Sequence, residues 1–141
     1  MSELTLTVSK TIPAPPEAVF NAWLDPVMLR RFMVTCEGDR VPRAESDARE
    51  GGRFVIVMES GGKEIPHSGT YLELNPYSRL VFTWESPHSV DGSTVTVALS
   101  PVGADKTELV LTQVKFASEG ARDGHIKGWT AILDMLVSVA G

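Results

Sequence analysis

The sequence predicts an α+β domain in which one long C-terminal helix covers an antiparallel sheet. Most of the middle of the chain alternates apolar and polar residues between turn signals, as the strands of a meander do. The last segment instead repeats apolar residues at helical spacing. The 141 residues are the size of one ordinary domain, so we expect residues 1–141 to share a single core.

The first part of the chain predicts one strand and two short helices. Residues 4–9 alternate apolar and polar side chains, which is the period of a half-buried strand. Three prolines within residues 13–16 end this strand, and proline is favourable in the first turn of a helix. Asp25 followed by Pro26 repeats that start signal and predicts a second short helix over about residues 26–32.

The middle of the chain predicts about six strands joined by tight turns. Gly-Gly, Asn-Pro and Asp-Gly pairs separate the extended segments, and such pairs are typical of hairpins. For the strand over residues 63–74, the sequence does not decide which face of the sheet is inward. His67 and Tyr71 lie on one face of the strand, whereas Leu72 and Leu74 lie on the other. Five of these extended segments have readable bounds, at residues 53–59, 63–74, 79–85, 95–99 and 109–113.

The end of the chain predicts one long helix. Ile126, Trp129, Leu133 and Leu136 recur at helical spacing between about residues 118 and 139, and Ser118 is a plausible N-cap. A helix of roughly 20 residues is about 30 Å long, which is enough to cross a sheet. We therefore expect Trp129, Leu133 and Leu136 to be buried against the sheet.

Composition and charge exclude several classes of function. The net charge is −5, and an acidic protein does not attract a phosphate backbone, so we expect no nucleic-acid partner. The single cysteine, Cys36, cannot form an intramolecular disulfide, which suits a reducing compartment. The N-terminus lacks the pattern of a signal peptide, and no apolar run approaches the roughly 20 residues that span a bilayer. We expect a cytoplasmic protein without a membrane partner.

Five motifs in register resemble a known family, and they lie at residues 13–23, 51–54, 79–84, 107–113 and 116–129. The chain is similar to the heat-shock-protein-90 ATPase activator-like family (AHSA-type domain) of the START-like (SRPBCC) superfamily, as a single-domain bacterial-type member. The resemblance implies a helix-grip fold, which is a curved antiparallel sheet wrapped around the C-terminal helix. It also implies binding of hydrophobic small molecules, action on polyketides, or assistance to the chaperone.

Eukaryotic co-chaperones that resemble this domain carry an additional N-terminal domain that drives stimulation of the ATPase. This sequence begins directly at the first predicted strand. A chaperone interaction is therefore the least favoured of the functions that the resemblance implies.

A curved sheet and a long helix leave a space between them, and inward-facing side chains line it. A mostly apolar lining with a few polar groups is typical of a small-molecule site. Packing of an ordinary core explains the aliphatic members of the set equally well. The predicted ligand-binding residues are Trp23, Phe54, Met58, His67, Tyr71, Phe82, Trp84, Val97, Leu111, Gln113, His125, Trp129 and Leu133.

His125 is the single candidate for a catalytic role. It precedes Trp129 by one helical turn and either contacts a ligand, moves a proton, or forms a hydrogen bond with a neighbour such as Gln113. Tyr71 or a strand carboxylate turned inward beside His67 is the alternative catalytic partner.

Other signatures of catalysis and of metal binding are missing. The sequence has no nucleophile elbow or phosphate loop. His67, His88 and His125 lack the spacing of metal ligands, so we expect no metal and no cofactor.

The function that the sequence favours is binding of a small hydrophobic ligand, aromatic or polyketide-like. A cyclase, dehydratase or hydrolase acting on such a ligand is one alternative, and a co-chaperone-like interaction module is the other. Val55 and Val57 lie between charged residues on the predicted outer face of the sheet, which suggests a homodimer.

Overall fold

Ten elements follow one another in the computed structural model, which describes residues 4–35, 38–87 and 89–140. Cys36 and His88, for which the sequence predicts no disulfide and no metal ligation, lie outside the described residues. The elements are β1 (Thr5–Ile12), α1 (Pro16–Ala22), α2 (Pro26–Phe32), β2 (Arg40–Ser46), β3 (Arg53–Ser60), β4 (Lys63–Asn75), β5 (Arg79–Thr83), β6 (Thr94–Val102), β7 (Lys106–Val114) and α3 (Glu119–Ala140).

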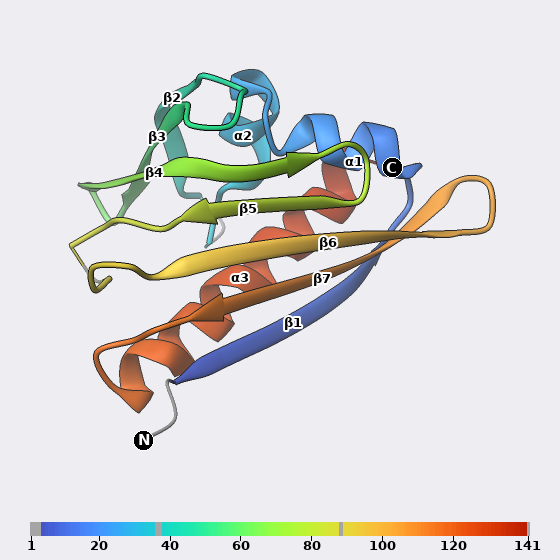
Figure 1. Cartoon of the computed structure of the whole chain (residues 1–141). Helices are drawn as coiled ribbons and strands as arrows, with labels where there is room; N and C mark the ends of the chain where they lie inside the picture. The colour runs from blue at the N-terminus through green and yellow to red at the C-terminus, as the bar shows by residue number, and fades with distance from the viewer. Residues whose placement is uncertain (1–3, 36–37, 88, 141) are drawn as a thin grey trace.

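Within the described residues, seven strands form one antiparallel sheet in the order β1-β7-β6-β5-β4-β3-β2. Figure 1 shows α3 lying along one face of this curved sheet. The helix packs against β1 and α2, whereas α2 also packs against β2 and α1 packs against β6 and β7. The predicted α+β helix-grip fold is confirmed.

The helix ends follow the signals in the sequence. The Oγ atom of Ser118 accepts a hydrogen bond from the backbone N–H of Ala121 at 3.1 Å, as the predicted N-cap requires. Asp25 caps α2 in the same way, because its Oδ1 atom accepts from the N–H of Val27 at 2.9 Å. In α3, the residues Trp129, Ile132, Leu133 and Leu136 are buried, which confirms the predicted packing face.

Strand β2 was absent from the predicted segments. Its sequence shows little alternation, since Val41 is its only buried residue and Pro42 removes a backbone donor. The strand lies at the edge of the sheet, and its register with β3 shifts between Arg40 and Arg43. An edge strand tolerates both features because one of its sides has no neighbour.

A bulge in β4 settles the orientation that the sequence left open. Tyr71 pairs with Phe82 but Glu73 pairs with Val81, so Leu72 is an extra residue without a partner on β5. Leu72 is 52% exposed, whereas Tyr71 is buried and Leu74 packs against the core. The bulge therefore lets residues of both parities face inward.

The outer face of β3 carries the residues on which the predicted homodimer rests. Val55 and Val57 are half-buried there and alternate with the buried Phe54 and the buried Ile56. The homodimer stays a prediction, which sedimentation at high micromolar concentration would test.

Candidate functional site

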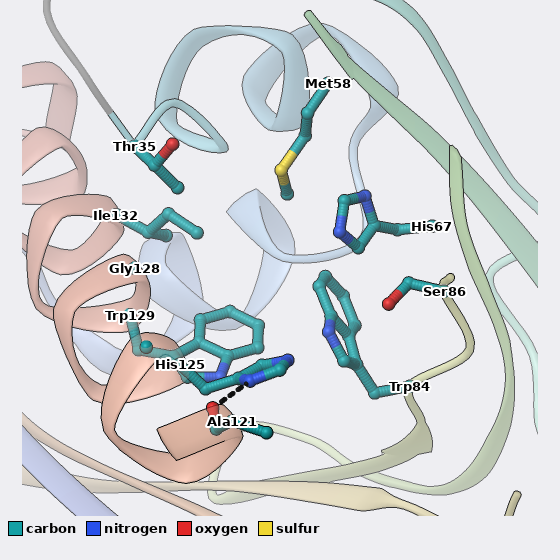
Figure 2. A pocket seen from close by; sticks show the side chains of 11 residues that line it. Thr35, Met58, His67, Trp84, Ser86, Ala121, His125, Gly128, Trp129 and Ile132 are labelled. Atoms are coloured by element: carbon teal, nitrogen blue, oxygen red, sulfur yellow. Dashed lines mark hydrogen bonds between the residues drawn. The ribbon is translucent and has the colours of Figure 1, made fainter. Parts of the chain in front are cut away.

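An open cavity of about 430 Å³ lies between the first half of α3 and the strands β3 and β4. Its apolar lining comes from Met58, Trp84, Trp129 and Ile132, together with small residues of α3. Its polar lining consists of Thr35, His67, Ser86 and His125. Figure 2 shows that residues of the sheet side, Met58, His67 and Trp84, face residues of α3, His125, Trp129 and Ile132.

Two indoles form the aromatic part of the wall. The ring centroids of Trp84 and Trp129 lie 4.8 Å apart, and the His67 ring lies 4.9 Å from Trp84. Trp84 directly follows β5, and its backbone N–H donates to the carbonyl of Ser93 at 2.9 Å. Backbone pairing therefore fixes the segment that presents the Trp84 indole to the cavity.

A buried chain of hydrogen bonds holds the Trp129 indole in place. Its Nε1–H donates to Oε1 of Gln113 at 2.7 Å, and Nε2 of Gln113 donates to Oγ of Ser93 at 2.8 Å. The Ser93 hydroxyl in turn donates to the carbonyl of Val114 at 3.1 Å. Because the Gln113 side chain is fully buried and bonded at both ends, it connects β7 to α3 and to the residue directly before β6, and it does not line the cavity.

His125 has a different partner from the neighbour considered in the sequence. Its Nδ1 atom lies 2.7 Å from the carbonyl oxygen of Ala121, one helical turn earlier, and makes no bond to Gln113. The Phe116 ring lies 5.2 Å from the imidazole. The ring reaches from α3 towards Trp84, and its other nitrogen lies on the cavity side (Figure 2).

Two glycines of α3 also line the cavity. Gly124 and Gly128 lie one turn apart on this face of the helix. A Cβ atom added at Gly124 would meet no atom within 4 Å, and one at Gly128 would meet only the Thr35 methyl group at 3.7 Å. Neither glycine has a left-handed φ angle, so no backbone conformation requires it.

Comparison with known proteins decides the family. Residues 13–141 match the family described as "Activator of Hsp90 ATPase homolog 1-like protein". The chain belongs to this family.

Solved structures agree with the assignment, while no curated protein matches the chain. A protein from Chromobacterium violaceum is 27% identical with a TM-score of 0.83, and the match covers 97% of both chains. A protein from Rhizobium loti is 28% identical with a TM-score of 0.77, covering 97% of this chain and 96% of the other. An Hsp90 activator from Plasmodium falciparum is 26% identical with a TM-score of 0.71, covering 90% and 88%. These findings support the AHSA-type, START-like assignment.

The AHSA1-like fold separates the predicted site residues into three groups. Met58, His67, Trp84, His125 and Trp129 line the open cavity. A gap of only about 10 Å³ behind the Trp84 indole is lined by Trp23, Phe54, Tyr71 and Phe82. The remaining predicted residues, Val97, Leu111, Gln113 and Leu133, are buried in the core.

Several lining residues were not among those predicted. Ala121, Gly128 and Ile132 fall on the same helical face as His125 and Trp129, so the spacing within α3 could have found them. Thr35 and Ser86 come from irregular segments, where no periodicity points to a cavity.

Among the residues that the structure describes, no carboxylate lines the cavity beside His125. Arg40 donates a hydrogen bond to Glu59 at 2.9 Å and so lowers the pKa of that carboxyl group. Arg53 holds Glu85 in the same way and lowers the pKa of its carboxyl group, and both Arg53 and Glu85 are exposed. None of the described residues that line the cavity is an aspartate, a glutamate, a lysine or an arginine.

Tyr71, the other catalytic partner considered, is also directed elsewhere. Its hydroxyl lies 2.8 Å from Oγ of Ser46, and it does not line the open cavity. Burial raises the pKa of the phenol.

Among the described residues, no group of three or more His, Cys, Asp or Glu side chains is placed to hold a metal ion. No helix in the described ranges is both long and apolar enough to cross a membrane.

Proposed function

We propose that this protein binds a small hydrophobic ligand, aromatic or polyketide-like, in the cavity beside α3. The observation that carries the proposal is an open cavity of about 430 Å³ walled by two indoles, a methionine and an isoleucine. Small-molecule sites typically measure about 300–1,000 Å³ and combine such walls with a few polar groups. Thr35, His67, Ser86 and His125 supply those polar groups.

The glycines of α3 support the proposal independently of the volume. A glycine inside a helix costs about 1 kcal/mol relative to alanine. Positions 124 and 128 are glycines although a Cβ atom would fit at both, so the helix is less stable there than it would be with alanine. Retention of open space in front of the helix explains both positions, because larger side chains there would fill the cavity.

The proposal is tested by closing the cavity without harming the core. Gly124→Leu places a side chain in the open space, and the helix gains the better propensity of leucine. Gly120→Leu is the matched control, because Gly120 is an exposed glycine of the same helix that does not line the cavity. Trp84→Ala is less informative, since Trp84 is 3% exposed and its loss would also disturb the core.

N-phenylnaphthylamine, a neutral probe that fluoresces in apolar surroundings, serves as the ligand. We expect it to bind the native protein and to quench tryptophan emission. Gly124→Leu should weaken this binding at least about tenfold, which is the scale of losing one well-filled apolar subsite, and Gly120→Leu should leave it unchanged. Equal binding by all three proteins would place the probe outside the cavity and contradict the proposal.

A second candidate function is a co-chaperone-like interaction. It is favoured by the similarity of the whole domain to the Hsp90 activator from Plasmodium falciparum. Stimulation of the ATPase of purified Hsp90 that is equal in native and Gly124→Leu proteins would favour this candidate. It would then use a surface other than the cavity.

A further inference from the structure

The hydrogen bond of His125 fixes which of its nitrogens carries the proton. A backbone carbonyl can only accept a hydrogen bond, so the contact of 2.7 Å to Ala121 requires a proton on Nδ1. In a neutral imidazole the other nitrogen, Nε2, is then an acceptor. Nε2 makes no hydrogen bond to any residue that the structure describes, and Figure 2 shows it on the cavity side.

The rest of the lining favours an uncharged ligand. None of the described residues that line the cavity is an aspartate, a glutamate, a lysine or an arginine, and the indoles of Trp84 and Trp129 form its aromatic wall. Placing a charged group in apolar surroundings without a partner is costly, whereas a flat neutral ring gains from contact with aromatic faces.

We infer that the ligand is a neutral aromatic ring bearing a hydrogen-bond donor, such as a phenolic hydroxyl, which donates to Nε2 of His125. This inference rests on the proposed ligand-binding function and adds the chemical class of the ligand. A ligand that covers Nε2 without offering a donor leaves a desolvated acceptor unpaired, which weakens binding. The site therefore selects hydroxylated rings over their ethers.

Isothermal titration calorimetry with three naphthalenes substituted at the same position tests the inference. Naphthol offers a donor, methoxynaphthalene has only an acceptor, and naphthoate is an anion. At about pH 8, we expect naphthol to bind about 5- to 10-fold more tightly than methoxynaphthalene. Naphthoate should bind more weakly than naphthol.

Two variants locate the acceptor. In His125→Leu, naphthol and methoxynaphthalene should bind with about equal affinity, because the hydroxyl of naphthol then meets no acceptor. Thr130→Val removes a hydroxyl of the same helix that does not line the cavity and should keep the full preference. A preference that persists in His125→Leu would assign the acceptor to another group and overturn the inference.

A measurement on the native protein keeps the test independent of how the variants fold. The ¹⁵N chemical shifts of the His125 imidazole should report a proton on Nδ1 at this pH, and the Nε2 signal should move when naphthol is added. A proton on Nε2 would overturn the inference.

The outcomes separate this inference from the function on which it rests. Equal binding of naphthol and methoxynaphthalene, or tighter binding of naphthoate, would refute the donor selectivity and leave the ligand-binding function standing. Failure of every naphthalene and of N-phenylnaphthylamine to bind would refute both.

Discussion

The hydrogen-bonded chain from Trp129 through Gln113 to Ser93 makes a quantitative prediction about stability. Each side chain in it is at most 2% exposed, so none can exchange its partner for bulk water. Removing one partner therefore leaves a buried polar atom unpaired, which costs about 1–3 kcal/mol. Removing both partners of one bond avoids part of that cost.

The two single substitutions are Gln113→Leu and Trp129→Phe. Gln113→Leu leaves the Trp129 N–H without an acceptor and should lower the free energy of unfolding by about 2–3 kcal/mol. Trp129→Phe leaves Oε1 of Gln113 unpaired and also loses ring volume, for a total of about 2–4 kcal/mol. In the double variant no atom of this bond remains to be orphaned. We expect it to be about 1–2 kcal/mol more stable than the sum of the single effects predicts.

Urea unfolding followed by circular dichroism measures all four proteins of the cycle. Trp23→Phe is the matched control, because Trp23 is equally buried but its Nε1 has no hydrogen-bond partner among the described residues. Trp23→Phe should cost only the ring volume, about 1–2 kcal/mol. Additive effects within about 0.5 kcal/mol in the cycle, or equal costs for Trp23→Phe and Trp129→Phe, would refute the role assigned to this chain.

Three further substitutions test the fold around the site. Ionisation of Tyr71 is expected to lower the free energy of unfolding at alkaline pH. Burial raises the pKa of its phenol above 10.0 in the folded state. The stabilisation by the neutral buried phenol is therefore complete below pH 10 and is lost as the pH rises through the folded pKa. Tyr71→Phe should remove this loss in urea unfolding at increasing pH, and an identical alkaline decline would contradict it. Gly69→Ala should cost more than about 3 kcal/mol in thermal unfolding, because its Cβ atom would lie 2.0 Å from the Thr83 carbonyl oxygen; a mild effect would contradict that close approach. Asp25→Ala should cost about 1 kcal/mol through the loss of the α2 cap, and Asp25→Asn should restore most of it.

The helices and their inward faces could be predicted from the sequence because each depends on local signals. Ser118 and Asp25 cap their helices as their chemistry requires, and the apolar stripe of α3 follows from its period. For the same reason Trp129 and His125 were correctly placed on the face that looks towards the sheet.

The facing of β4 and the role of Gln113 could not be predicted, because both depend on contacts between elements that are distant in the sequence. The bulge at Leu72 is defined by the partners of Tyr71 and Glu73 on β5, and it decides which side chains face inward. Gln113 was placed on the correct face of β7, but its two buried partners are Ser93, directly before β6, and Trp129 on α3. Because those partners occupy its amide, the residue supports the wall of the cavity from behind.

Helix α3 has to pack into the core and also has to leave space for the cavity. Different parts of the helix meet these two requirements, which explains where the cavity lies. Its second half buries Ile132, Leu133 and Leu136 and contributes to the core. Its first half presents Gly124, His125 and Gly128 to the cavity, and these residues give the helix little packing. Residues that break a local rule without a structural need often mark a functional position. The glycines meet that description, whereas the buried residues beyond them obey every rule of an amphipathic helix.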